Sequence, residues 1–110
     1  MEDQLNCITR LRIQREGEDT KTAFGHGTAQ LLLGIQELQS LNRAAKRMGM
    51  AYSKAWKSIR STEEHLGFQL IERKAQHGSV LTEEGARFLD HFLRAEAAAQ
   101  KAAAEVFKDW

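Results

Sequence analysis

The chain has 110 residues, a length typical of one domain with a single modest core. Its hydrophobic fraction of 42% and charged fraction of 28% are ordinary for a globular protein, and no apolar stretch approaches the roughly 20 residues of a membrane-spanning helix. The single cysteine, Cys7, cannot form an internal disulfide, and the acidic first residues do not resemble a secretory signal. We therefore expect one domain over residues 1–110, located in a reducing cytoplasm, with no membrane partner.

The net charge of +1 conceals an uneven distribution of charge along the chain. The segment from Thr28 to Thr62 contains six basic residues and one acidic residue, Glu37, and so carries +5, whereas the rest of the chain carries −4. A polyanion responds to such a local excess and not to the average. A run of charges can also be no more than the solvated face of a helix. The motif described below favours the binding of a polyanion instead.

The first predicted elements are extended. Apolar and polar residues alternate from Leu5 to Gln14, which is the period of a half-buried strand. Residues 16–19 predict a polar turn, and residues 21–24 a short returning strand. The run Gly25-His26-Gly27 then interrupts the pattern.

Helical periodicity begins at Thr28, which can cap a first helix. A shorter helix is predicted from Leu41 to Met48, with Ser40 or Asn42 as its cap. A third helix is predicted over Tyr52–Leu66, with Tyr52, Ala55, Ile59, Thr62 and Leu66 on its inner face.

A hairpin and a long helix complete the predicted order. Residues 68–73 and 79–81 form the strands, with a polar tip at residues 74–78. Thr82 is a good cap for a last helix from Glu83 to about Phe107. Strand or strands, a three-helix core, a β-hairpin wing and a long C-terminal helix define a mainly α (α+β) winged helix-turn-helix fold.

Residues 41–66 show the pattern of the helix-turn-helix itself, two helices joined by a tight turn at Gly49. The second helix of such a unit fits the major groove, and Ala44 and Ala45 provide the small residues that let the first helix brace it closely. Phosphates and base edges require cations and hydrogen-bonding groups on the outer surface. The predicted DNA-binding residues are Arg43, Lys46 and Arg47 on the bracing helix, Tyr52, Ser53, Lys54, Lys57 and Arg60 on the recognition helix, and Arg73 and Lys74 in the wing, whose tip also carries Gln76 and His77.

The run from Ser40 to Ile59 resembles the N-terminal DNA-binding domain of ModE-type molybdenum-responsive regulators, most specifically in Tyr-x-x-Ala-Trp at residues 52–56. Residues 70–73 and 81–85 look like that family's wing and the start of its last helix. The helix-turn-helix and wing are more distantly similar to those of LysR-type regulators, which normally lack a leading strand. The resemblance covers essentially the whole chain. It implies a bacterial transcriptional regulator, not an enzyme, that binds an inverted-repeat operator in double-stranded DNA as a homodimer.

Three features depart from the ModE-type pattern. The full-length proteins carry a molybdate-binding region, and this chain ends at Trp110, so we expect no cofactor and no molybdate binding by the chain, whether it is a stand-alone protein or a fragment. Ala51 stands where the family usually has a capping Ser, a loss of about 1 kcal/mol. The wing tip at residues 74–78 is short and has one glycine.

Residues 83–110 are predicted to form the dimerisation element. Six alanines between residues 97 and 104 permit close helix–helix approach, although high helix propensity alone also accounts for them. The apolar residues of this segment are more than one small domain readily covers. The predicted dimer contacts are Phe88, Phe92, Val106, Phe107 and Trp110.

Other functions were weighed against DNA binding. Tyr52 and Trp56 could stack on single-stranded nucleic acid, although aromatic residues at helical spacing are more often core and rim. The four histidines and Cys7 show no CxxC, HxxxH or HExxH spacing, so no metal site is predicted. No phosphate loop, nucleophile elbow or catalytic carboxylate pair is recognisable. A protein-interaction module is the main alternative, but it does not require the clustered cations.

Overall fold

The computed structural model describes residues 5–17 and 24–110, with the side chain of His77 outside the described part. The elements in chain order are α1 (His26–Leu38), α2 (Leu41–Arg47), α3 (Tyr52–Leu66), β1 (Ile71–Lys74), a 3-10 turn (Ala75–His77), β2 (Gly78–Leu81) and α4 (Glu83–Val106). This order confirms the winged helix-turn-helix prediction, and α3 has the predicted bounds. No helix in the described ranges is both long enough and apolar enough to cross a membrane.

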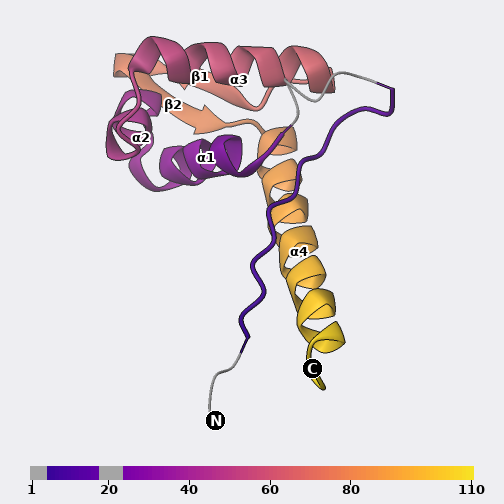
Figure 1. Cartoon of the computed structure of the whole chain (residues 1–110). Coiled ribbons are helices and arrows are strands. Elements are labelled where there is room, and N and C mark those ends of the chain that lie inside the picture. The colour runs from indigo at the N-terminus through magenta and orange to yellow at the C-terminus, as the bar shows by residue number, and fades with distance from the viewer. Residues whose placement is uncertain (1–4, 18–23) are drawn as a thin grey trace.

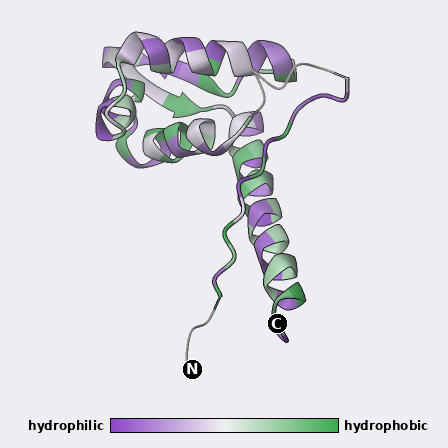
Figure 2. Cartoon of the chain, in the orientation of Figure 1, coloured by the Kyte–Doolittle hydropathy of each residue, from purple (hydrophilic) through white to green (hydrophobic). Residues whose placement is uncertain are grey.

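The molecule consists of a head and an arm (Figure 1). The head contains α1, α2, α3 and the hairpin, and α4 extends away from it. A helix of the 24 residues in α4 is about 36 Å long, which accounts for the elongated dimensions of 54 × 33 × 23 Å. Hydrophobic colour lies on β2 and on the part of α4 next to the head, whereas α3 is largely hydrophilic along its outward side (Figure 2).

The core lies between α1, α3 and the first half of α4. Its centre is Phe24, which is fully buried and whose ring lies 4.8 Å from that of Phe88 and 5.0 Å from that of Phe92 in edge-on geometry. Phe92 is 2% exposed in a single chain, so its predicted role as a dimer contact is wrong. Phe88 is half-buried in the same aromatic cluster, where it also packs against Phe68.

The bracing helix packs closely because small residues line its contact with α1. Ala44 and Ala45 are buried, as predicted. A side chain at Gly34 of α1 would place its Cβ 2.7 Å from the Cβ of Ala44, so only glycine permits this approach. Gly49, with φ of 69°, then makes the turn into α3.

Side chains cap three helix ends. The Ser40 hydroxyl accepts a hydrogen bond from the Arg43 backbone N–H, so Ser40 and not Asn42 is the cap of α2. Thr82 caps α4 through the Gly85 N–H, at 2.9 Å, as predicted. Ala51 offers no side-chain acceptor at the start of α3. The last carbonyls of α3 accept hydrogen bonds from the Arg15 guanidinium.

The wing is shorter than expected. Its antiparallel register runs from Ile71 opposite Leu81 to Lys74 opposite Gly78, so the strand pairing begins three residues later than residue 68. Phe68 precedes the strand because it packs into the aromatic cluster instead.

The strand predicted over Leu5–Gln14 is reduced to one isolated bridge, between Ile13 and Phe24. Apart from Phe24, the returning strand predicted over residues 21–24 lies outside the described residues. The extended segment runs along α4 (Figure 1). The backbone N–H of Leu11 donates to the Glu96 carboxylate, and the Thr9 hydroxyl donates to the Glu96 carbonyl. Both the side chain and the backbone carbonyl of Glu96 in α4 therefore accept hydrogen bonds from this segment, in place of a neighbouring strand.

Candidate nucleic-acid interface

The recognition helix α3 presents an apolar face inward and a polar face outward. Ala55, Ile59, Thr62 and Leu66 are buried as predicted, but Tyr52 is 39% exposed and does not belong to the inner face. Tyr52 lies in the first turn of α3, where its hydroxyl accepts a hydrogen bond from Arg73 of the wing. The exposed face carries Ser53, Lys54, Lys57 and Arg60.

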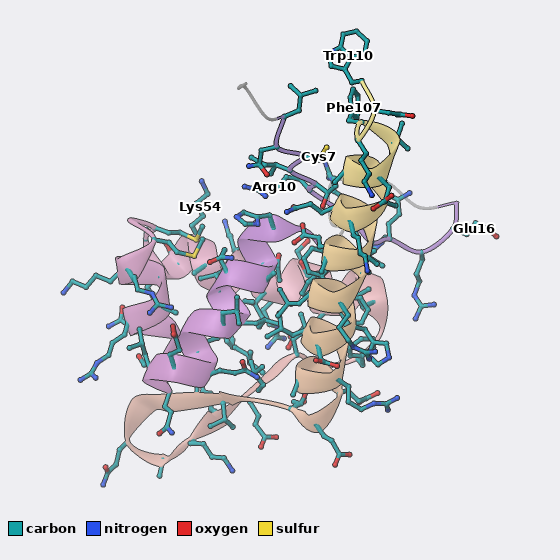
Figure 3. All side chains as sticks on the ribbon, turned by 90° about the horizontal axis from the view of Figure 1, so that it is seen from below. Cys7, Arg10, Glu16, Lys54, Phe107 and Trp110 are labelled. Atoms are coloured by element: carbon teal, nitrogen blue, oxygen red, sulfur yellow. The ribbon has the colours of Figure 1, made fainter. Side chains whose placement is uncertain are left out.

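Two cations of this face have ends that extend into solvent. Lys54 projects away from the ribbon (Figure 3), and Lys57, nearly one helical turn further along, is also exposed. Among the ion pairs of the described residues, none involves Lys54 or Lys57. Both ammonium groups are therefore available to an anionic partner.

The bracing helix α2 adds three more exposed cations, two of them without an ion-pair partner in the described part of the chain. Arg43 and Lys46 are exposed. Arg47 forms an ion pair with Glu37 of α1 at 2.6 Å, with both side chains about half exposed. Such a solvent-exposed pair contributes about 0–1 kcal/mol, so Arg47 can exchange this carboxylate for a phosphate at small cost.

An aromatic cluster joins the recognition helix to the wing. The guanidinium of Arg60 lies 5.4 Å from the centre of the Trp56 ring, and that of Arg73 lies 5.0 Å from it. Arg73 also donates a 2.9 Å hydrogen bond to the Tyr52 hydroxyl. Trp56, half-buried, stands at the border between core and surface as predicted.

Sequence reasoning missed Glu63. This carboxylate is 9% exposed, and its Oε2 accepts hydrogen bonds from the backbone N–H of Leu70 at 2.7 Å and of Ile71 at 3.3 Å. It thereby fixes the start of β1 against the end of α3. An acidic residue next to the inner-face residue Thr62 was the available signal, because a buried carboxylate needs hydrogen-bond donors.

The wing contributes less charge than expected. Lys74 is exposed and pairs with Glu72 at 3.6 Å, which offsets part of its charge. The tip is exposed at Gln76, whose φ of 61° makes the turn. No three His, Cys, Asp or Glu side chains gather to hold a metal ion within the described ranges.

A small-residue bracing helix, a recognition helix with a cationic outer face and an adjoining hairpin define a winged helix-turn-helix DNA-binding domain. Residues 28–86, more than half of the chain, match the bacterial regulatory helix-turn-helix proteins of the LysR family, and the chain belongs to that family. The LysR-type resemblance, the more distant one in the sequence analysis, is thus the one established. The domain is the DNA-binding part of a transcriptional regulator.

Solved structures share the fold. The DNA-binding domain of CbnR in complex with DNA is 23% identical, with a TM-score of 0.61 over 74% of this chain and 93% of that one. Full-length CbnR with its target DNA is 24% identical with a TM-score of 0.59, and ArgP from Mycobacterium tuberculosis is 25% identical with a TM-score of 0.57. The matches span 73% and 74% of this chain but 27% and 30% of those regulators. No curated protein matches the sequence.

Proposed function

We propose that the chain is a sequence-specific binding protein, not an enzyme, that places α3 in the major groove of an operator and regulates transcription in the cytoplasm. The observation that carries the proposal is the outward, carboxylate-free position of Lys54 and Lys57 on α3. A helix with such a face fits the major groove and can donate to guanine O6 and N7. The similar CbnR domain was solved in complex with DNA, which supports DNA as the partner.

The contacts divide by chemistry. On α3, Lys54, Lys57 and Ser53 face the base edges, and Arg60 lies at the far end of the same face. The cations of α2, Arg43, Lys46 and Arg47, face backbone phosphates, as does Lys74 of the wing.

We infer that the chain acts as a homodimer through the arm. Val106, Phe107 and Trp110 are 74%, 48% and 92% exposed at the end of α4, where hydrophobic colour returns (Figure 2). Phe107 and Trp110 lie together there, remote from Lys54 (Figure 3). Exposed apolar residues grouped in this way are typical of a protein–protein contact. Two-fold symmetry of the dimer would match an inverted-repeat operator.

We also propose that this domain is related to ModE-type regulators. The Tyr-x-x-Ala-Trp run at residues 52–56 supports it. The test compares the selected operator with those that ModE-type regulators bind. The same inverted repeat supports the relationship, and an unrelated one contradicts it.

Selection of bound fragments from random duplex DNA tests the main proposal. Enrichment of an inverted repeat, with affinity that falls as salt rises, is the expected result, because phosphate contacts release counterions. Binding without any salt dependence, or none at all, would favour the protein-interaction module instead.

A further inference from the structure

The wing and the recognition helix touch through side chains. Among the described residues, no backbone hydrogen bond joins β1 to α3. Two side chains make the connection instead: Glu63 of α3, which accepts from the N–H groups of Leu70 and Ile71, and Arg73 of β1, which donates to Tyr52. The Ser79 N–H of β2 also donates to the Gln39 carbonyl and Ile71 is buried in the core, so these contacts anchor the hairpin, while Glu63 and Arg73 make its direct polar contacts with α3.

Arg73 contacts two residues of α3 at once. Tyr52 and Trp56 are four residues apart and so lie on the same side of the helix. The Arg73 guanidinium lies over the Trp56 ring, and its NH2 group donates to the Tyr52 hydroxyl. A planar guanidinium can stack and donate in this way simultaneously, whereas a lysine ammonium cannot.

Trp56 is held by cations from two elements. Arg60, one turn further along α3, and Arg73 of β1 both lie within cation–π distance of its ring. Lys57, the next residue after Trp56, is exposed on the face that meets the groove. A rotation of α3 that carried Trp56 away from Arg73 would turn Lys57 by the same angle, because both residues are fixed to the same helix.

We propose that Arg73 is a positioning residue for base readout, not a phosphate contact. It fixes the wing and Trp56 relative to α3, and so sets the direction of the groove-facing side chains. This inference rests on the proposed DNA binding, and it replaces the direct contact expected for Arg73 from the sequence.

The first experiment needs no DNA. The chain has two tryptophans, so the variant Trp110→Phe leaves Trp56 as the only one. In this background Arg73→Lys should shift Trp56 emission to longer wavelength and increase its quenching by acrylamide, because the stacked guanidinium is lost. Lys74→Ala, the neighbouring exposed cation, should leave the emission unchanged. Unchanged emission in Arg73→Lys would overturn the proposal.

The second experiment measures how DNA binding by variants of the 110-residue chain depends on salt concentration. Arg73→Lys keeps the charge, so the salt slope should stay the same, while the ratio of specific to non-specific affinity falls by about tenfold, comparable with one mismatched base pair. Lys74→Ala should keep that ratio and reduce the slope by about 0.9, as expected for one lost phosphate contact.

A phosphate-contacting Arg73 gives the opposite result. In Arg73→Lys the ratio of specific to non-specific affinity would stay unchanged, and in Arg73→Ala the salt slope would fall by about 0.9. This pattern would overturn the positioning role. Circular dichroism checks the fold of each variant, and if Arg73→Ala does not fold, Arg73→Lys alone decides through the ratio. If the parent chain shows no salt-dependent DNA binding, the proposed function fails, while the tryptophan emission still tests the stack.

Discussion

At the scale of single residues, the position of a cation matters more than its presence. Arg47 pairs with Glu37, and Arg60 and Arg73 stack on Trp56, whereas Lys54 and Lys57 keep exposed, carboxylate-free ends. The six basic residues of the segment from Thr28 to Thr62 are thus not equivalent. Of the cations with free ends, Lys54 and Lys57 lie on the outer face of α3 and are the ones suited to discriminate between bases.

Replacement of Lys57 with alanine should test this distinction. We expect operator binding to weaken by about 1–3 kcal/mol, with relaxed preference at one base position, because a base-contacting ammonium is lost. Competition between the operator and its single-base variants measures both effects.

The matched control is Lys101→Ala. Lys101 is an exposed lysine of α4, so the substitution changes the net charge equally, but away from the head. We expect little change in operator affinity. Equal weakening by both variants would mean that overall charge, and not contact by Lys57, governs binding.

At the scale of elements, the sequence predicted helices better than extended segments. The bounds of α3 follow from its inner-face residues and Gly67, which ends the helix with φ of 88°. Alternation from Leu5 to Gln14 was equally regular, yet the segment lies on α4. A period of two shows that a segment is extended, but it does not identify the hydrogen-bond partner.

Contacts between residues far apart in the chain also could not be predicted from the sequence. The prediction that Phe92 meets a second copy failed because Phe24, 68 residues earlier, covers it. The Arg73–Trp56 contact likewise joins two elements whose spacing no local pattern encodes. The sequence therefore predicted which cations belong to the candidate interface. The structure shows which of them contact a carboxylate or an aromatic ring and which have free ends.

The missing cap of α3 predicts a stabilising substitution. Ala51 has the extended conformation of an N-cap residue but no side-chain acceptor. Ala51→Ser should raise the free energy of unfolding by about 1 kcal/mol, because the hydroxyl can accept a hydrogen bond from the first turn. Urea denaturation measures the change. Ala51→Val, which adds no acceptor, should not stabilise; equal effects of the two variants would exclude capping as the cause.

Close packing of α4 against the hairpin predicts the opposite effect at Gly85. A Cβ there would lie 2.2 Å from the Leu70 carbonyl oxygen. Gly85→Ala should therefore lower the free energy of unfolding by about 1–3 kcal/mol in spite of the better helix propensity of alanine. Thermal or urea unfolding tests this expectation.

Gly27→Ala provides the comparison, because a Cβ at Gly27 in α1 meets nothing within 4 Å. That variant should be neutral or more stable, by no more than about 1 kcal/mol. If both substitutions stabilise the chain, the approach of α4 to Leu70 is not as close as the structure indicates.

At the scale of the whole molecule, the head and the arm separate two tasks. The cationic face of α3 belongs to the head, and Val106, Phe107 and Trp110 lie at the end of α4 (Figures 1 and 3). A dimer formed by the arms would leave both recognition helices free. Half-sites for such dimers lie about 34–36 Å apart, or a multiple of this distance. The spacing of the selected inverted repeat therefore reports on how the arms pair.

The arm predicts how dimerisation and operator binding depend on each other. In the double variant Val106→Ser with Phe107→Ser, we expect the dimer dissociation constant to rise by about tenfold or more, because burial of each side chain is worth about 1.5–3 kcal/mol when complete. Analytical ultracentrifugation measures this constant. Affinity for the inverted repeat should fall with it, while affinity for a single half-site stays unchanged, since the head is intact.

Met48→Ser is the control, because Met48 is also an exposed apolar residue, 37% accessible, but lies at the end of α2 in the head. Its dimer dissociation constant should match that of the parent chain. If the double variant remains as dimeric as the parent, the end of α4 is not the dimer contact. If it becomes monomeric and still binds the inverted repeat with the parent affinity, each head recognises DNA independently and the symmetric operator loses its structural basis.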